Sequence, residues 1–256
     1  MALNGRPLTP AARHVRLREI WRLARFLHAE DPAHELPPAT LFPARKRRRL
    51  PYIYAPEELG ALVAAAGHLR NTYPLRRQVY ATLLGLIAAT GLRLSEALDL
   101  RLGDVLPDGI LHIRRTKFGK SRLIPLHPTV VVALRRYLAL RGPLPVLDDH
   151  VFLSAGNRRI ASSTINATFH RVLRLAEIAP NQHPRPRIHD LSHTVATRAL
   201  QQCATRREAV ARHFVALATY LGHADIADTY WYLAATPELL ADMATAAEVL
   251  VAKEEA

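Results

Sequence analysis

Five short segments of this chain contain side chains that could act on a phosphate group. Arg93 lies in ATGLRLSEALDL, Lys117 in TKFGKSRLIPL, His189 in IHDLSH, His223 in YLGH and Tyr232 in TYWYLAATPELL. Arginine and histidine N–H groups stabilise negative charge that develops on phosphate oxygens. A tyrosine hydroxyl becomes a nucleophile when a neighbouring base takes its proton. Each segment alone is a weak signal, but together these residue types could serve phosphoryl transfer.

The segment HDLSH also invites a metal-based interpretation. His189 and His193 stand four residues apart, as the two histidines of the zinc motif H-E-x-x-H do. Asp190 replaces the glutamate with a side chain one methylene shorter, and no third ligand segment follows at metalloprotease spacing. We therefore expect no metal site, and we expect His193 to be a packed structural histidine.

The composition favours a polyanionic partner. The 256 residues include 35 Lys or Arg against 22 Asp or Glu, a formal net charge of +13, and most of the cations are arginine. The planar guanidinium matches phosphate oxygens in pairs of hydrogen bonds, so nucleic acid is the favoured partner. The single cysteine, Cys203, excludes an intramolecular disulfide and a cysteine zinc finger and fits a reducing cytoplasm. The sequence shows no export signal and no apolar run long enough for a membrane span.

The N-terminal region divides into a helix and a linker. Apolar side chains alternate with arginines over residues 11–29 at the spacing of an amphipathic helix. Residues 30–55 hold several prolines and the basic run RKRRR, which predicts an irregular linker.

The elements that must position the candidate residues follow this linker. A helix is predicted from Pro56, which suits a first turn, to Gly67, and a second over residues 75–90. Gly91 supplies a left-handed turn before helix resumes, which places Arg93 at a helix-to-helix turn.

The next segment predicts the only sheet. ILHIRRT and SRLIPL are short β-type runs that would form a hairpin with Lys117 and Lys120 at its tip. From about residue 128 the pattern is helical again. The expected fold is mainly α with a small antiparallel β-sheet.

In their order and spacing, the five segments resemble the tyrosine recombinase (phage integrase) family over about residues 51–240. The resemblance implies that family's catalytic-domain fold, double-stranded DNA as substrate, a homotetramer on DNA and no metal or other cofactor. It also implies strand cleavage and rejoining through a 3′-phosphotyrosyl intermediate.

The resemblance assigns roles to individual residues. Arg93 and His223 would bind the phosphate oxygens, and His189 would accept the tyrosine proton. Lys117 would protonate the departing 5′ oxygen, with Lys120 as the alternative donor. Tyr232, nine residues after His223, holds the position of the nucleophile.

A second tyrosine and a set of basic residues complete the predictions. Tyr230 would point about 200° away from Tyr232 on a helix, so only one of them can face the phosphate. The basic run could be a solvated segment or an address signal, but it occupies the place of the family's DNA-crossing linker. The predicted DNA contacts are Arg45, Lys46, Arg47, Arg48, Arg49, Lys120 and Arg122.

Two departures from the family pattern qualify this interpretation. Ser192 stands where the third segment should carry an arginine, and neither Arg187 nor Arg198 has the spacing to replace it. Residues 1–50 hold a helix and linker where the family has a separate core-binding domain, so we expect a shortened N-terminal region followed by a catalytic domain at 51–256. Two hypotheses remain: a recombinase, impaired at Ser192, or an inactive DNA-binding remnant or regulator of an intact recombinase.

Overall fold

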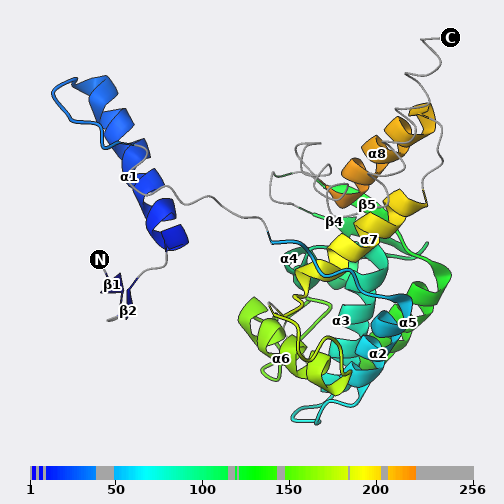
Figure 1. Cartoon of the computed structure of the whole chain (residues 1–256). Helices are drawn as coiled ribbons and strands as arrows, with labels where there is room; N and C mark the ends of the chain where they lie inside the picture. Colours follow the sequence, from blue (N-terminus) through cyan, green and yellow to red (C-terminus); the bar gives the residue numbers. More distant parts are fainter. Residues whose placement is uncertain are drawn as a thin grey trace. The chain divides into compact units, whose positions relative to one another are not determined.

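The chain folds as two compact units, residues 1–50 and 51–256, in a computed structural model (Figure 1). The structure describes residues 2–3, 6–7, 10–38, 49–114, 119, 121–142, 148–183, 185–202 and 207–222.

The first unit contains the predicted basic helix. Helix α1 spans Pro10–Glu30, and a short hairpin of β1 (Ala2–Leu3) and β2 (Arg6–Pro7) precedes it. The helix was predicted and the hairpin was not. Val15, Ile20 and Leu23 of α1 are exposed.

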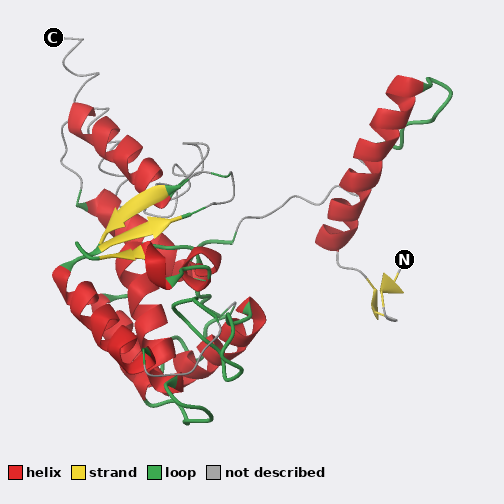
Figure 2. Ribbon diagram, turned by 180° about the vertical axis from the view of Figure 1, so that it is seen from behind, coloured by secondary structure: helices red, strands yellow, loops and turns green. Residues whose placement is uncertain are grey.

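The second unit is helical with one small sheet at its side (Figure 2). Strands β3 (Val105–Leu106), β4 (Ile110–Ile113) and β5 (Arg122–Pro125) pair antiparallel in this order. The structure therefore confirms the predicted fold class and adds β3 to the predicted hairpin. The helices are α2 (Pro56–Gly67), α3 (Arg76–Thr90), α4 (Leu94–Leu98), α5 (Pro128–Arg141), α6 (Ser162–Leu175), α7 (His189–Gln201) and α8 (Arg207–Leu221), with a 3₁₀ turn η1 (Leu102–Asp104).

Local signals in the sequence set the helix ends. Pro56 begins α2, and the carboxylate of Glu58 accepts a hydrogen bond of 2.8 Å from the Ala55 amide, which satisfies a free donor of the first turn. Gly67 ends this helix as predicted. Apolar side chains of α2, α3 and α6, such as Leu62, Leu83 and Phe169, are fully buried in one core.

Gly91 brings three helices together. Its φ of 68° is left-handed, and a Cβ there would lie 3.2 Å from Leu221 of α8 and 3.3 Å from Val195 of α7. The end of α3 therefore needs glycine both for its turn and for the close approach of α7 and α8.

Gly91→Ala should lower the free energy of unfolding by about 1–3 kcal/mol, because the left-handed backbone is strained for alanine and the contact is too close. Chemical denaturation measures the change. The matched control is Gly60→Ala, since Gly60 lies inside α2 with no atom within 4 Å of the added Cβ. This control should stabilise by about 0.4–1 kcal/mol. Equal effects at the two positions would contradict the assignment.

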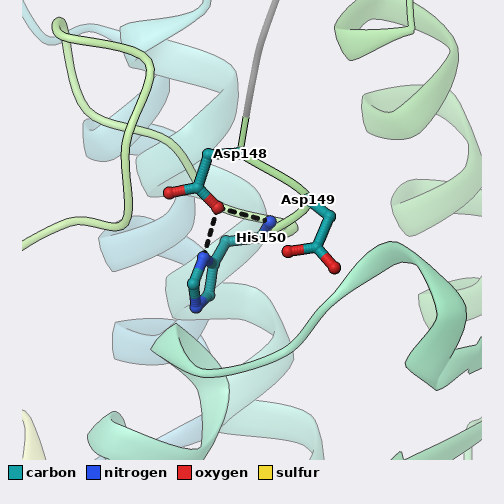
Figure 3. A group of neighbouring side chains, drawn as sticks. All are labelled: Asp148, Asp149 and His150. Atoms are coloured by element: carbon teal, nitrogen blue, oxygen red, sulfur yellow. Dashed lines mark hydrogen bonds and ion pairs between the residues drawn. The ribbon is translucent and has the colours of Figure 1, made fainter.

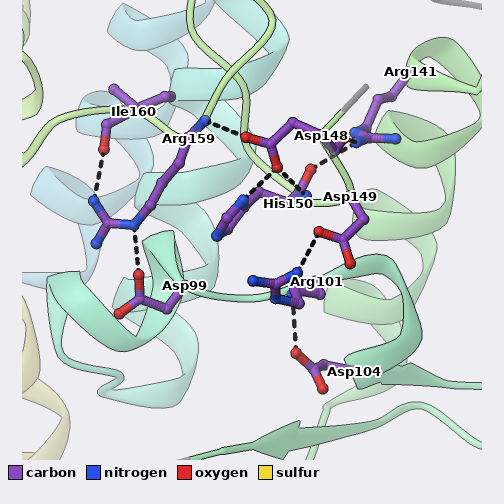
Figure 4. A network of polar contacts seen from close by, with 9 residues as sticks. All are labelled: Asp99, Arg101, Asp104, Arg141, Asp148, Asp149, His150, Arg159 and Ile160. Atoms are coloured by element: carbon purple, nitrogen blue, oxygen red, sulfur yellow. Dashed lines mark hydrogen bonds and ion pairs between the residues drawn. The ribbon is translucent and has the colours of Figure 1, made fainter. Parts of the chain in front are cut away.

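A polar network holds the loop after α5. The buried Arg141 donates hydrogen bonds to the carbonyl oxygens of Asp148 and His150 at 2.8 and 2.7 Å. Arg101 pairs with Asp149, and the Arg159 amide donates to Asp148 (Figure 4). The bonds of Arg141 and Arg159 satisfy backbone groups or fix side chains in a segment without helix or strand.

Candidate active site

Arg93 occupies the turn between α3 and α4, as predicted. It is the N-cap of α4, where its amide donates to the carboxylate of Glu96 at 3.1 Å. Its guanidinium donates from Nη1 to Glu96 Oε1 at 2.8 Å and from Nη2 to the Gly222 carbonyl at 3.4 Å. The side chain is still 27% exposed, so it can reach an external anion.

Glu96 binds a second arginine as well. Arg122 of β5 donates from Nη1 to Oε1 at 3.1 Å and from Nη2 to Oε2 at 2.8 Å, a two-bond pair. Burial alone would raise the pKa of the Glu96 carboxyl. The hydrogen bonds and charge of Arg122, and then those of Arg93, outweigh burial and hold this pKa below its ordinary value. Glu96 is therefore an anionic centre shared by two guanidinium groups.

The end of α8 closes this cluster. Arg122 Nε donates to the Tyr220 carbonyl at 2.8 Å, and its guanidinium lies against Gly222, where an added Cβ would come within 2.6 Å of Nη1. Gly222 has a left-handed φ of 68° and directly precedes His223 in the sequence. The arginine segment, the hairpin strand and the start of the second histidine segment therefore meet around Glu96.

His189 is the first residue of α7. Its ring contacts that of His193 edge to face, with 4.7 Å between the centroids. Part of the residue is exposed, but neighbouring protein atoms shield the ring from water. This desolvation is the largest cause of a lowered pKa of the imidazole. The charges of Arg187 and, more weakly, Arg93 lower this pKa further, against an opposing effect of Asp190. A neutral imidazole can accept a proton.

We expect the imidazole of His189 to titrate below its ordinary value of 6.5 in a proton NMR titration. Replacing Arg187 with Met should raise this pKa, because the guanidinium disfavours the charged ring. Arg198→Met is the control, since Arg198 donates instead to the Tyr54 carbonyl at 2.7 Å. The pKa of His189 is lower in the folded chain than in the unfolded chain, where it is 6.5. The free energy of unfolding therefore keeps its full contribution from His189 above pH 6.5 and loses it as the pH falls below that value. A pKa at or above 6.5 would contradict this account.

Ser192 lies beside the arginine segment. It is 4% exposed, and its hydroxyl donates to the carbonyl of Leu92 at 2.9 Å, one residue before Arg93. Position 192 is therefore adjacent to the Arg93 turn, but its hydroxyl is engaged by the backbone.

The other arginines near α7 have partners of their own. Arg187 donates from Nη2 to Asp190 Oδ1 at 2.9 Å, and its amide donates to the other carboxylate oxygen at 2.8 Å. Its side chain remains 44% exposed beside His189. Arg187 therefore acts on the candidate base His189, whereas Arg198 is bonded to the Tyr54 carbonyl.

The end of the predicted linker docks along α7. The Tyr54 amide donates to Thr194 at 3.0 Å, and the Tyr54 hydroxyl donates to the Arg187 carbonyl at 3.4 Å. This anchoring was not predicted, and neither was the pairing of Glu96 with Arg122. The sequence places Arg93 three residues before Glu96, a spacing that allows an ion pair within one helical turn, but nothing near Glu96 in the sequence indicates Arg122.

Several predicted site residues lie outside the described residues. Arg49 is described and is partly buried. Those outside are Arg45, Lys46, Arg47, Arg48, Lys117, Lys120, His223, Tyr230 and Tyr232. For all of them, the sequence assignments stay predictions. Arg122 was predicted to contact DNA, and its side chain is directed into the Glu96 cluster with 11% exposed.

Among the described residues, a group with the chemistry of a metal ligand set lies elsewhere. Ligand atoms of Asp148, Asp149 and His150 fall within 4.8 Å of one another (Figure 3). Asp148 already accepts from the amide and ring of His150, and Asp149 pairs with Arg101 at 2.7 Å. Burial raises the pKa of Asp148, but these hydrogen bonds outweigh it and lower the pKa to about 2. We interpret this group as a structural network, because its polar side chains already have partners inside the protein.

Comparison with known proteins defines the class. The Phage integrase family model matches residues 54–238. The chain is 38% identical over 235 residues to y4rB of Sinorhizobium fredii, named as an integrase/recombinase, covering 88% of this chain and 74% of that protein. It is 30% identical over 238 residues to the tyrosine recombinase XerD of Brucella abortus, covering 91% and 74%. The chain belongs to the phage integrase family of tyrosine recombinases.

Solved structures of recombinases share the fold. A post-cleavage complex of the XerH site-specific recombinase with its difH substrate superposes with a TM-score of 0.70 at 19% identity, covering 94% of this chain and 68% of that one. A lambda integrase tetramer bound to a Holliday junction gives 0.64 at 18% identity, covering 87% and 59%. Over the described part of the chain, no helix is long and apolar enough to cross a membrane.

Proposed function

We propose that this chain is a site-specific DNA recombinase that cleaves and rejoins strands through a 3′-phosphotyrosine at Tyr232. The observation that carries the proposal is the cluster around Glu96. There Arg93, strand β5 of the hairpin and the turn that leads into His223 converge, with position 192 adjacent. Family membership and the order of the sequence segments support the same chemistry.

In the proposed reaction, the Tyr232 oxygen attacks a DNA phosphorus atom, and His189 takes the hydroxyl proton. Arg93 and His223 stabilise the negative charge on the two non-bridging oxygens as it grows. The bond to the 5′ oxygen breaks, and Lys117 or Lys120 gives this oxygen its proton. The phosphate stays attached to Tyr232 until a 5′ hydroxyl of a partner strand attacks it and releases the tyrosine.

The proposal assigns the two units different tasks. Residues 51–256 form the catalytic domain, and the basic run at residues 45–49, with Lys120, contacts the DNA backbone. DNA-bound relatives, among them the lambda integrase tetramer on a Holliday junction, support double-stranded DNA as the partner and a homotetramer as the assembly.

One observation favours a second candidate function. Ser192 carries no charge and its hydroxyl is engaged by the Leu92 carbonyl, so position 192 offers the phosphate neither a cation nor a free donor. In this alternative, the chain occupies DNA or joins an intact recombinase without cutting.

Covalent capture distinguishes the two candidates. The purified chain is incubated with random-sequence duplexes that each carry one nick, so that a short cleaved strand can diffuse away and the intermediate accumulates. A recombinase leaves protein–DNA complexes that resist detergent and disappear with protease, and sequencing of the attached DNA reveals the preferred site. A chain that binds the same DNA and leaves no such complex is the non-cutting form.

Tyr232→Phe should abolish the covalent product, because it removes the attacking oxygen. Tyr230→Phe is the matched control two residues away and should retain the product. Detergent-resistant complexes, quantified on gels after equal DNA binding is confirmed, give the comparison. Product from the Tyr232 variant, or loss only in the Tyr230 variant, would reject Tyr232 as the nucleophile.

A further inference from the structure

Every nitrogen of the Arg122 guanidinium has a partner inside the second unit. Nε donates to the Tyr220 carbonyl, and Nη1 and Nη2 donate to the two carboxylate oxygens of Glu96. With 11% of the side chain exposed and three bonds at 2.8–3.1 Å, the group is held in one orientation.

These contacts join elements that are distant in the sequence. Glu96 of α4 precedes Arg122 by 26 positions, and Tyr220 of α8 follows it by 98. Strand β5, which carries Arg122, directly follows the segment that holds Lys117 and Lys120. One side chain therefore fixes the relative placement of three of the segments that carry candidate chemistry.

Arg122 also limits how Glu96 binds Arg93. The two arginines share Oε1, while Oε2 is engaged by Arg122 Nη2 and by the Arg93 amide. With two guanidinium groups against one carboxylate, the cluster keeps one excess positive charge. Without Arg122, the buried carboxylate would keep Arg93 as its cationic partner among the described residues and would draw that guanidinium into a two-bond pair.

We propose that Arg122 is a positioning residue, which holds Glu96 so that the Arg93 guanidinium stays aimed at the DNA phosphate and the turn before His223 stays in place. This inference rests on the proposed function. It gives Arg122 a task inside the site in place of the DNA contact predicted from the sequence.

The test uses the full chain with Arg122→Met, which keeps the length and removes the charge, and Arg122→Lys, which restores a charge. Arg135→Met is the matched control, because Arg135 is an exposed arginine that donates to the Pro107 carbonyl away from the cluster. Arg122→Met/Glu96→Gln removes both charges and provides a folded variant if the single change is too destabilising. Three quantities are measured: the NMR signal of the Arg93 guanidinium, assigned by its loss in Arg93→Lys, the affinity for a random-sequence duplex, and the rate of covalent complex formation in the parent and Ser192→Arg chains.

We expect Arg122→Met to shift the Arg93 signal and to slow covalent complex formation by about 100-fold, as a misplacement of about 1 Å does. DNA affinity should stay close to that of the parent, and Arg122→Lys should recover part of the rate. The Arg135 control should change none of these quantities.

The alternatives give different results. An unmoved Arg93 signal in folded Arg122→Met overturns the inference, whether or not the rate falls. Glu96→Gln removes the partner of Arg93 directly, so the double variant is compared with Glu96→Gln alone. A further shift of the Arg93 signal in the double variant also overturns the inference, because Arg122 is proposed to act through Glu96. A large loss of affinity with an unchanged rate also overturns it and makes Arg122 a DNA contact. If no variant forms a covalent complex, the proposed chemistry fails, and the Arg93 signal still decides whether Arg122 positions that side chain.

Discussion

Ser192→Arg is expected to increase the rate of covalent protein–DNA complex formation by about 100- to 1000-fold, the usual effect of one donor to a developing oxyanion. Ser192 lies next to the Arg93 turn, since its hydroxyl bonds to the Leu92 carbonyl. A guanidinium at this position would bring a second cation to the phosphate that Arg93 is proposed to bind. The rate is measured on nicked duplexes under conditions in which all of the DNA is bound.

The matched control is Ser192→Met, which adds a long side chain without charge. Both variants lose the hydroxyl bond to Leu92, worth about 1 kcal/mol, and crowd a buried position at a cost of about 1–3 kcal/mol. Chemical denaturation should therefore show similar losses of stability for both, and only the arginine variant should gain activity. If Ser192→Arg folds, binds DNA and gains nothing, another cation already serves the phosphate. Arg187, exposed beside His189, is then the next position to replace.

Affinity for duplex DNA should decrease by about 1000-fold or more between 50 and 200 mM salt, provided that the chain makes about six or more phosphate contacts. The net charge of +13 and the basic run at residues 45–49 are the reasons. Counterions released from DNA on binding make the logarithm of the binding constant linear in the logarithm of salt concentration. Fluorescence anisotropy with a labelled duplex gives the slope.

Replacing the five residues of the basic run with glutamine should reduce this slope by about 0.9 for each phosphate contact removed. The control replaces Arg135 and Arg136, two exposed arginines of α5, and should leave the slope nearly unchanged. An unaltered slope without the basic run would mean that other cations bind the backbone. A chain that prefers one short sequence a thousandfold would show that it reads bases well and does not bind mainly through phosphates of any sequence.

Much of the local structure was predictable because its causes lie within a few residues. Pro56 and Gly67 mark the ends of α2, and the β4–β5 hairpin follows from two short β-type runs. Gly91 was expected to turn the chain before Arg93, and its φ of 68° confirms this. Strand β3 was missed, since two residues give too short a pattern to detect.

The order of the chemical segments also identified the family without any structure, and the family comparison confirms it. The family can be predicted in this way because each chemical role in the reaction requires a particular kind of side chain at a particular place in the order of segments. The same reasoning predicts that Ser192 is the departure from the family pattern. It could not reveal that the hydroxyl is already bonded to Leu92, a partner 100 positions away.

The sequence by itself determined the main helices, the β4–β5 hairpin and the family, and it predicts the candidate residues. These depend on backbone hydrogen bonds, side-chain periodicity and turn residues that act over short stretches of chain. Only the tertiary structure decided which charges meet. Arg122 could bind DNA or Glu96 as far as the sequence is concerned. The position of β5 in the fold lets its side chain reach Glu96 of α4 and the Tyr220 carbonyl of α8, and so selects Glu96. Ion pairs between distant residues depend on how whole helices and strands are placed in the fold. The residues next to either partner in the sequence therefore do not predict them.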